Sequence, residues 1–145
     1  DTENRPPREW IEFRDRLRPL DGVIFATPEY NRSVPGVLKN AIDVGSRPYG
    51  SSVWASKPAA IISVSPGMYG AFGANHHLRQ SLVFLDMPAM PQPEAYISQA
   101  NKLFDQAGAL TNDAVRDLLE KFIASFGSWL ELHATQPQPA ARKSA

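Results

Sequence analysis

Two uninterrupted apolar runs divide the chain, and each is followed by a polar loop and then by a helical pattern. Residues 23–26 read Val-Ile-Phe-Ala, and residues 59–64 read Ala-Ala-Ile-Ile-Ser-Val. Short apolar runs of this kind, without polar alternation, predict parallel strands buried on both faces. The repeated order of strand, loop and helix predicts an α/β fold, in which ligands bind beyond the carboxyl ends of the strands.

Four segments carry apolar residues three and four positions apart, as amphipathic helices do. The first spans about residues 7–18, because Pro19 disfavours helical geometry in the residue before it. The second follows Pro35, the third spans residues 76–86, and a long last helix begins at a cap formed by Thr111 or Asn112. The side chains expected to face the core are Trp10, Ile11, Phe13, Leu17 and Leu20; Val37, Leu38, Ala41, Ile42 and Gly45; Leu78, Leu82, Val83 and Leu85; and Val115, Leu118, Leu119, Phe122, Phe126 and Trp129.

Two segments between these elements are less regular. Residues 88–93 contain three prolines, so we expect there a short, irregular third strand at a sheet edge. Residues 45–57 predict a surface loop. Within it, Tyr49 and Trp54 either form a substrate wall or subunit contact, or cover the preceding helix, and the sequence supports both interpretations equally.

Composition and charge narrow the class of partner. The 145 residues predict one domain, and equal numbers of basic and acidic side chains give no support to nucleic acid or an anionic membrane as a partner. The absence of cysteine excludes disulfides, thiolate nucleophiles and cysteine metal sites. Because the sequence has neither an apolar run near the ~20 residues that span a bilayer nor a basic-then-apolar leader, we expect a cytoplasmic protein without a membrane partner.

Histidine and serine side chains give no support to metal or hydrolytic chemistry. His76 and His77 are adjacent in a predicted helix, so their side chains point about 100° apart and cannot share one ion. Ser65 follows a predicted strand, but residues 63–67 read Ser-Val-Ser-Pro-Gly, which is not the Gly-x-Ser-x-Gly of a nucleophile elbow. We predict no metal site.

Two blocks of sequence resemble one known family. The first reads Pro-Glu-Tyr-Asn at residues 28–31, followed by Ser-Val-Pro-Gly, Leu-Lys-Asn-Ala and Ile-Asp up to residue 43. The second contains residues 63–67, glycines 70 and 73, His-Leu-Arg-Gln at 77–80 and Leu-Val-Phe-Leu at 82–85. Both blocks are similar to the NADPH-dependent FMN reductase family, which includes bacterial quinone and chromate reductases. The similarity extends more weakly from about Trp10 to about Leu132.

The resemblance implies a flavodoxin-like three-layer sandwich with a parallel sheet, formed by residues 1–133, with residues 134–145 as a disordered tail. Family members have five strands in the order 2-1-3-4-5 and bind the FMN phosphate in a loop after the first strand. The present sequence matches the family only from the segment before its third strand onward. We therefore expect the first two strands and the phosphate loop to belong to a longer gene product, of which this chain is about two thirds.

The resemblance also implies the site and the reaction. Residues that match flavin-contacting positions of the family are Pro28, Glu29, Tyr30, Asn31, Ser33, Ser65, Pro66 and Gly67. No side chain is assigned a catalytic role, because FMN carries the chemistry: hydride from NADPH or NADH would reduce it, and two electrons would pass to a quinone, chromate or a similar acceptor. A homodimer or homotetramer is expected, with the helix after Pro35 and the loop that follows it at the interface.

The same residues also have simpler explanations. Tyr30 alone could be a surface aromatic, Glu29 a solvated acid, and Asn31 a turn residue that bonds local backbone. Arg79 could pair with a carboxylate across a subunit interface or bind a nucleotide phosphate, and its place on a helix with an inward apolar stripe favours the first. Gly73 stands where some family members carry Arg. The competing hypothesis for the whole chain is a flavodoxin-like binding or assembly module without flavin.

Overall fold

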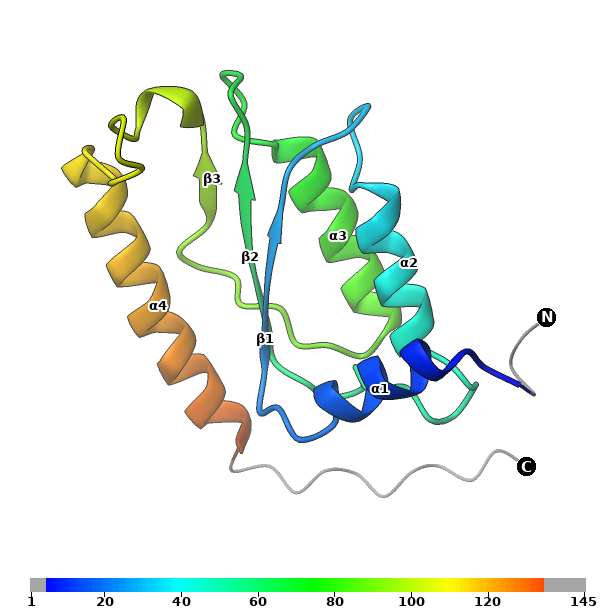
Figure 1. Cartoon of the computed structure of the whole chain (residues 1–145). Coiled ribbons are helices and arrows are strands. Elements are labelled where there is room, and N and C mark those ends of the chain that lie inside the picture. Colours follow the sequence, from blue (N-terminus) through cyan, green and yellow to red (C-terminus); the bar gives the residue numbers. More distant parts are fainter. Residues whose placement is uncertain (1–4, 135–145) are drawn as a thin grey trace.

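The computed structural model describes residues 5–134, and its centre is a three-stranded parallel sheet. The strands β1 (Val23–Thr27), β2 (Ala59–Val64) and β3 (Ala95–Ile97) lie in the order β1-β2-β3. Val23 pairs with Ala59, and Ile62 pairs with Ala95. Helices cover both faces of this sheet (Figure 1), so the predicted three-layer α/β arrangement is confirmed.

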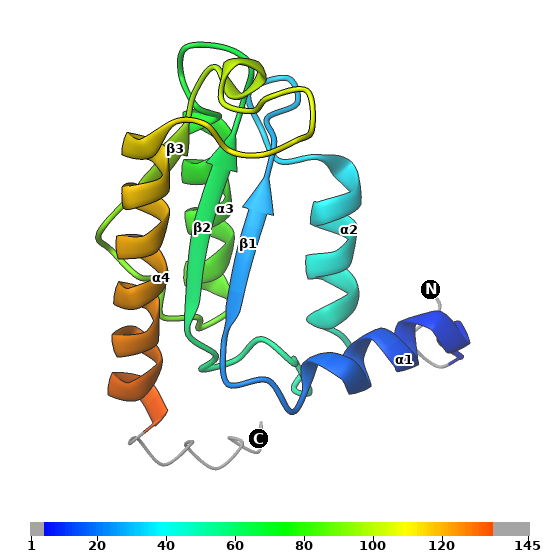
Figure 2. The same cartoon turned by 60° about the vertical axis from the view of Figure 1, so that its left-hand side comes forward.

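The helices α2 (Gly36–Gly45) and α3 (Phe72–Phe84) lie together on one face of the sheet, and α1 (Arg8–Leu17) packs beside α2 near the amino ends of the strands (Figures 1 and 2). The buried side chains of this layer are Phe25, Ile42, Val53, Trp54, Ala59, Ile61, Leu78, Leu82 and Met87. Trp54 is 2% exposed, and its indole N–H donates to the Ile42 carbonyl at 2.8 Å. Trp54 therefore covers the preceding helix, whereas Tyr49 is 79% exposed.

The long helix α4 (Asp113–Ala134) covers the other face, after a single turn η1 (Ala100–Lys102). Its buried residues Phe122 and Phe126 pack with Ala60, Met90 and Ala95 of the sheet side. The Asn112 side-chain oxygen accepts the Val115 N–H at 3.0 Å, which confirms Asn112 as the cap. The expected tail at 134–145 lies, from residue 135 onward, outside the described residues.

Several predicted details are wrong. The strand expected at residues 88–93 is β3 instead, since Ala89 forms only an isolated bridge to Ala59 and prolines cannot donate to a ladder. Helix α3 begins at Phe72, four residues before the predicted start. Ala26 is exposed because α4 crosses the sheet obliquely and approaches β1 only near its own carboxyl end (Figure 1).

The helical faces are also narrower than predicted. Exposed apolar side chains that the spacing had placed in the core are Ile11, Leu20, Val37 and Val83. In α1 the buried residue is Arg14, whose guanidinium donates to the Val44 carbonyl at 2.8 Å. The short helix α1 lies at the end of the sheet and can bury only part of its apolar stripe, which accounts for the exposure of Ile11. No helix within residues 5–134 is long and apolar enough to cross a membrane.

Candidate functional site

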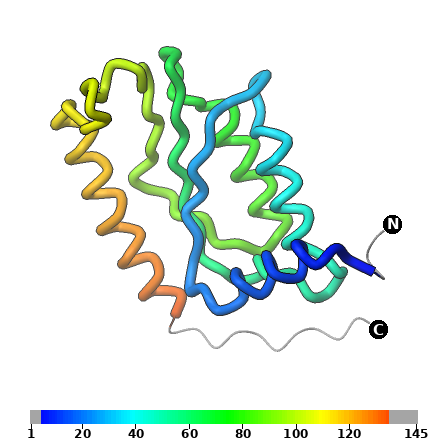
Figure 3. Tube along the Cα trace, viewed as in Figure 1, coloured from blue at the N-terminus to red at the C-terminus, as the bar shows by residue number. Residues whose placement is uncertain are grey.

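Three loops meet at the carboxyl ends of the strands, which is the end of a parallel sheet where ligands bind. Residues 28–35 follow β1, residues 65–71 follow β2, and residues 98–112 follow β3. The trace places all three at one end of the molecule (Figure 3), whereas α1 and the last turn of α4 lie at the other. All eight residues predicted to contact flavin belong to the first two of these loops.

The first loop is a tight two-residue turn. Tyr30 and Ser33 exchange backbone hydrogen bonds, with N···O distances of 2.9 and 3.0 Å. Between them Asn31 and Arg32 have φ values of 51° and 64°, so both adopt the left-handed conformation of a type I′ turn. Asparagine tolerates this conformation, but arginine is strained in it. The turn leaves the Tyr30 side chain 61% exposed at the end of the sheet.

Two side chains of this loop reach α3. The Glu29 carboxylate accepts the Ala74 N–H at 3.1 Å, and Ser33 Oγ lies 2.7 Å from His77 Nδ1. The Glu29 side chain is only 13% exposed and also lies 3.5 Å from the exposed Arg32 guanidinium. The side chains of Glu29 and Ser33 thus form hydrogen bonds within the protein, and the backbone groups of Ser33 are bonded to Tyr30.

The second loop is fixed by its own backbone and by the segment after β3. The Ser65 N–H donates to the Ile97 carbonyl at 2.9 Å, and the Gly67 N–H donates to Ser65 Oγ at 3.0 Å. Pro66 has no N–H. The amide groups of residues 65–67 are therefore already used or absent, whereas Met68 N–H and Asn31 N–H have no acceptor among residues 5–134.

A chain of buried polar groups supports the second loop from below. Ser63 Oγ donates to the Gly70 carbonyl at 2.8 Å and accepts from the Asn75 amide at 3.2 Å. The Asn75 oxygen accepts from Arg79 at 3.0 Å, and Arg79 also donates to the Met90 carbonyl at 3.1 Å. Arg79 is therefore part of this internal chain. Sequence reasoning missed Ser63 and Asn75, although a serine inside an apolar run was the available signal.

Tyr96, at the end of β3, is a further residue that the sequence analysis missed. Its hydroxyl donates to Glu94 at 2.7 Å and lies 3.1 Å from His76 Nε2. Burial, followed by the hydrogen bond and the charge of Glu94, raises the Tyr96 pKa to about 12. Phe72 packs on both rings, with centroids 4.1 Å from His76 and 5.3 Å from Tyr96. The two adjacent histidines thus face different partners, as their helical spacing predicted.

Large exposed apolar side chains surround these polar loops. They are Tyr30, Met68, Tyr69, Phe72 and Phe104. The Arg32 guanidinium lies 5.6 Å from the centre of the Tyr69 ring, so one cation lies among them. Exposed aromatic rings and unpaired backbone N–H groups at one sheet end suit a flat, partly polar ligand such as a flavin. The residues present therefore fit this cofactor.

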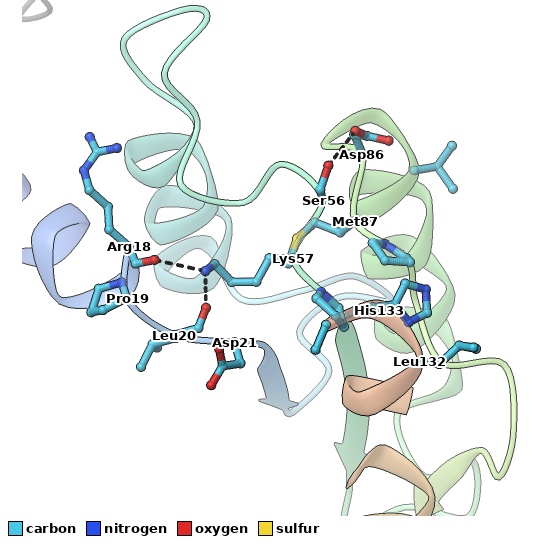
Figure 4. A pocket seen from close by; sticks show the side chains of 14 residues that line it. Arg18, Pro19, Leu20, Asp21, Ser56, Lys57, Asp86, Met87, Leu132 and His133 are labelled. Carbon is cyan, nitrogen blue, oxygen red and sulfur yellow. Dashed lines mark hydrogen bonds between the residues drawn. The ribbon is translucent and has the colours of Figure 1, made fainter. Parts of the chain in front are cut away.

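The opposite end of the sheet holds a hollow of about 910 Å³ (Figure 4). Its central residue is Lys57, whose ammonium donates to the backbone carbonyls of Arg18 and Leu20. Burial lowers the Lys57 pKa, and the nearby Asp21 charge acts in the opposite direction. These contacts close the end of α1. Lys57 therefore has a structural role. The hollow around it lies at the other end of the sheet from the loops at residues 28–35 and 65–71.

Comparison with known proteins agrees with this arrangement. Residues 1–102 match the family described as NADPH-dependent FMN reductase. A quinone reductase of Pseudomonas putida is 61% identical over 128 residues, which cover 88% of this chain and 68% of that protein. An NAD(P)H-dependent FMN reductase of Pseudomonas aeruginosa is 46% identical over 118 residues, which cover 81% of this chain and 63% of that protein.

Among solved structures, the flavoenzyme NAD(P)H:(acceptor) oxidoreductase FerB of Paracoccus denitrificans superposes with a TM-score of 0.85 at 39% sequence identity. The match covers 92% of this chain and 73% of that one. The sheet, its helical layers and both sequence blocks thus agree with the same group of flavoproteins. The chain belongs to the NADPH-dependent FMN reductase family.

Proposed function

We propose that this protein is an FMN-dependent NAD(P)H oxidoreductase that reduces quinones. The observation that carries the proposal is the meeting of the two family loops at the carboxyl end of the sheet, among exposed aromatic side chains. The names of its relatives support the acceptor class, because they include a quinone reductase and a 2-hydroxy-1,4-benzoquinone reductase. Chromate and related oxidants are secondary candidates.

FMN would be held by the loop residues Pro28, Glu29, Tyr30, Asn31, Ser33, Ser65, Pro66 and Gly67. Tyr30 supplies an exposed ring at the end of β1, and the Asn31 N–H can donate to a polar edge of the ligand. Ser65, Pro66 and Gly67 supply a fixed backbone surface, since their amide groups are used or absent. When bound, FMN accepts hydride from NAD(P)H and releases two electrons to the acceptor.

Backbone amides are suited to this task. Fixed N–H dipoles favour negative charge on a bound flavin without an ionised side chain beside it, and they need no reorganisation during the reaction. The two loops provide such dipoles at Asn31 and Met68. The neighbouring aromatic side chains would exclude water from the flavin and give a quinone ring a surface on which to lie.

The direct test combines native mass spectrometry with steady-state kinetics on the purified protein. We expect an FMN mass on each subunit and NADPH-dependent reduction of a benzoquinone, with ping-pong kinetics. Tyr30→Ala should retain less FMN, with Phe84→Ala as a control at an exposed aromatic residue outside these loops and α2. A protein that binds no added FMN and reduces no quinone would instead support a flavin-free binding module.

Assembly and location complete the proposal. We place a homodimer or homotetramer interface on α2 and the loop that follows it, where Val37 is 81% exposed and Tyr49 is 79% exposed. Light scattering on the wild type and on Val37→Glu tests this interface, because a charge at its centre should shift the mass toward the monomer. A cytoplasmic location, where NAD(P)H is available, is testable by cell fractionation.

A further inference from the structure

Glu29 belongs to the family motif, yet its side chain bonds within the protein. The carboxylate contacts the first turn of α3, 45 residues further along the chain, where it accepts the Ala74 N–H at 3.1 Å. Ala74 is the third residue of that helix and is fully buried, so its N–H has no intrahelical acceptor. Without Glu29 this buried donor would be unpaired, which makes the contact valuable to the folded state.

Gly73 is the residue that permits this contact. A Cβ at position 73 would lie 2.9 Å from the Glu29 carboxylate oxygen and 3.0 Å from the Arg32 carbonyl. The first of these distances is shorter than real side chains show, and the second involves backbone that cannot move freely. A side chain at position 73 would therefore force the Glu29 carboxylate away from its present place and press on the backbone of the first loop.

A second contact holds the same turn one helical turn further along α3. Ser33 Oγ lies 2.7 Å from His77 Nδ1, and Ser33 is also the residue that closes the turn with Tyr30. The strained left-handed pair Asn31 and Arg32 lies between these two attachments. Strain of this kind persists only where the surroundings determine the conformation, and here Glu29 and Ser33 provide that determination.

We propose that Glu29 is a positioning residue, which fastens the Tyr30–Ser33 turn to the first turn of α3 and so fixes Tyr30 and the Asn31 N–H for the flavin. The effect on flavin binding rests on the proposed function, whereas the attachment of the turn to α3 does not. The negative charge of Glu29 near the amino end of α3 further favours the contact. Its ion pair with Arg32 adds little, because the Arg32 side chain is 77% exposed.

Amide hydrogen exchange tests the fastening without any flavin. In Glu29→Ala we expect exchange at Ala74, Tyr30 and Ser33 to accelerate about tenfold or more, since loss of one buried cap-like bond allows the turn to open. Gly73→Ala attacks the contact from the other side and should accelerate the same three amides. If Glu29→Ala fails to fold, amide exchange in Gly73→Ala alone tests the fastening. Unchanged exchange at all three amides would overturn the proposal, whether or not the protein binds FMN.

Binding measurements then test the consequence. Glu29→Ala should raise the FMN dissociation constant about tenfold, whereas Glu29→Gln, which keeps an acceptor oxygen for Ala74, should restore it to within about threefold and leave the FMN reduction potential unchanged. The control is Glu12→Ala, which removes an exposed ion pair with Arg8 on α1. If Glu29→Gln binds FMN as weakly as Glu29→Ala while exchange stays slow, the charge acts on flavin directly and the positioning role is wrong. Absence of FMN binding by the wild type would contradict the proposed function and leave the exchange result to decide the fastening.

Discussion

The two ends of the sheet differ in what their polar groups do. At the amino ends, a hollow of about 910 Å³ surrounds Lys57, whose ammonium is already bonded to the carbonyls of Arg18 and Leu20 (Figure 4). At the carboxyl ends, exposed aromatic rings surround the N–H groups of Asn31 and Met68, which have no acceptor among residues 5–134. The ammonium group at the first end is thus bonded within the protein, whereas the second end presents two backbone donors beside exposed aromatic rings.

If flavin binds at the carboxyl ends, as proposed, the volume of a hollow alone does not locate this ligand site. A hollow whose polar groups already cap a helix has few free polar groups with which to recognise a ligand. A shallow surface with free N–H donors and aromatic rings can recognise one. In a parallel sheet the carboxyl ends also carry the loops that change direction, so ligand-binding residues collect there. The comparison predicts that substitutions at the amino ends lower stability without weakening flavin binding, and that substitutions at the carboxyl ends do the reverse.

The largest effect should come from a fully buried residue of the core beneath α4. Phe122 is 1% exposed and packs against the sheet beneath α4. Phe122→Ala should lower the free energy of unfolding by about 3–5 kcal/mol, because it leaves a cavity in the core. Chemical denaturation measures this loss. A change below ~1 kcal/mol would mean that α4 does not pack on the sheet as described.

The next largest effect should come from a substitution at the amino end, which lowers stability and leaves FMN affinity unchanged. Lys57→Met preserves the length of the side chain but removes the donor to two carbonyls, so we expect a loss of about 1–3 kcal/mol in the free energy of unfolding. FMN affinity should remain within twofold of the wild type, since the carboxyl-end loops are untouched. A large loss of FMN affinity, measured by fluorescence titration, would mean that flavin binds near Lys57 and not at the carboxyl ends of the strands.

A substitution at the carboxyl end should have the converse effect, on FMN affinity and not on stability. Tyr30→Ala removes an exposed ring, so the free energy of unfolding should change by less than about 0.5 kcal/mol. The FMN dissociation constant should rise about tenfold, the size expected for one lost aromatic contact. Equal FMN affinity in the variant and the wild type would mean that Tyr30 is only a surface residue.

The smallest effect is a pair of opposite pH dependences. Because the Tyr96 pKa is raised to about 12, the stability that its hydroxyl contributes is complete below pH 10 and is lost between about pH 10 and 12. Because the Lys57 pKa is lowered, the unfolded chain holds more protons between that lowered value and 10.5, so stability rises with pH there. Unfolding of Tyr96→Phe and Lys57→Met, each compared with the wild type across alkaline pH, should show opposite slopes. Parallel slopes would contradict the described surroundings of at least one group.

The sequence predicted the layers better than their contacts. The apolar runs located β1 and β2 because a strand buried on both faces leaves a local composition signal. By contrast, α3 begins at Phe72 with a left-handed Ala71 before it, and the first turn is completed by Glu29, far away in the sequence. A start fixed by such a tertiary contact leaves no local pattern. This is why the predicted start at residue 76 was too late.

The candidate site was predicted at the level of loops, and less well at the level of atoms. The family motif correctly brought residues 28–33 and 65–67 to one end of the sheet. It could not indicate that the side chains of Glu29 and Ser33 bind α3, or that the Gly67 N–H bonds Ser65, because these depend on how loops pack after folding. Tyr96 was missed for the same reason, since its partners Glu94 and His76 meet it only in the folded protein.

The central claim is that flavin binds at the carboxyl ends of the strands. Titration of the isotope-labelled protein with FMN, followed by amide NMR, tests it most directly because each end of the sheet reports separately. The account predicts saturable shifts at residues 29–33 and 67–70, with residues 18–21 and 56–57 unchanged. Shifts confined to the surroundings of Lys57, or no shift at either loop with FMN in excess, would contradict it.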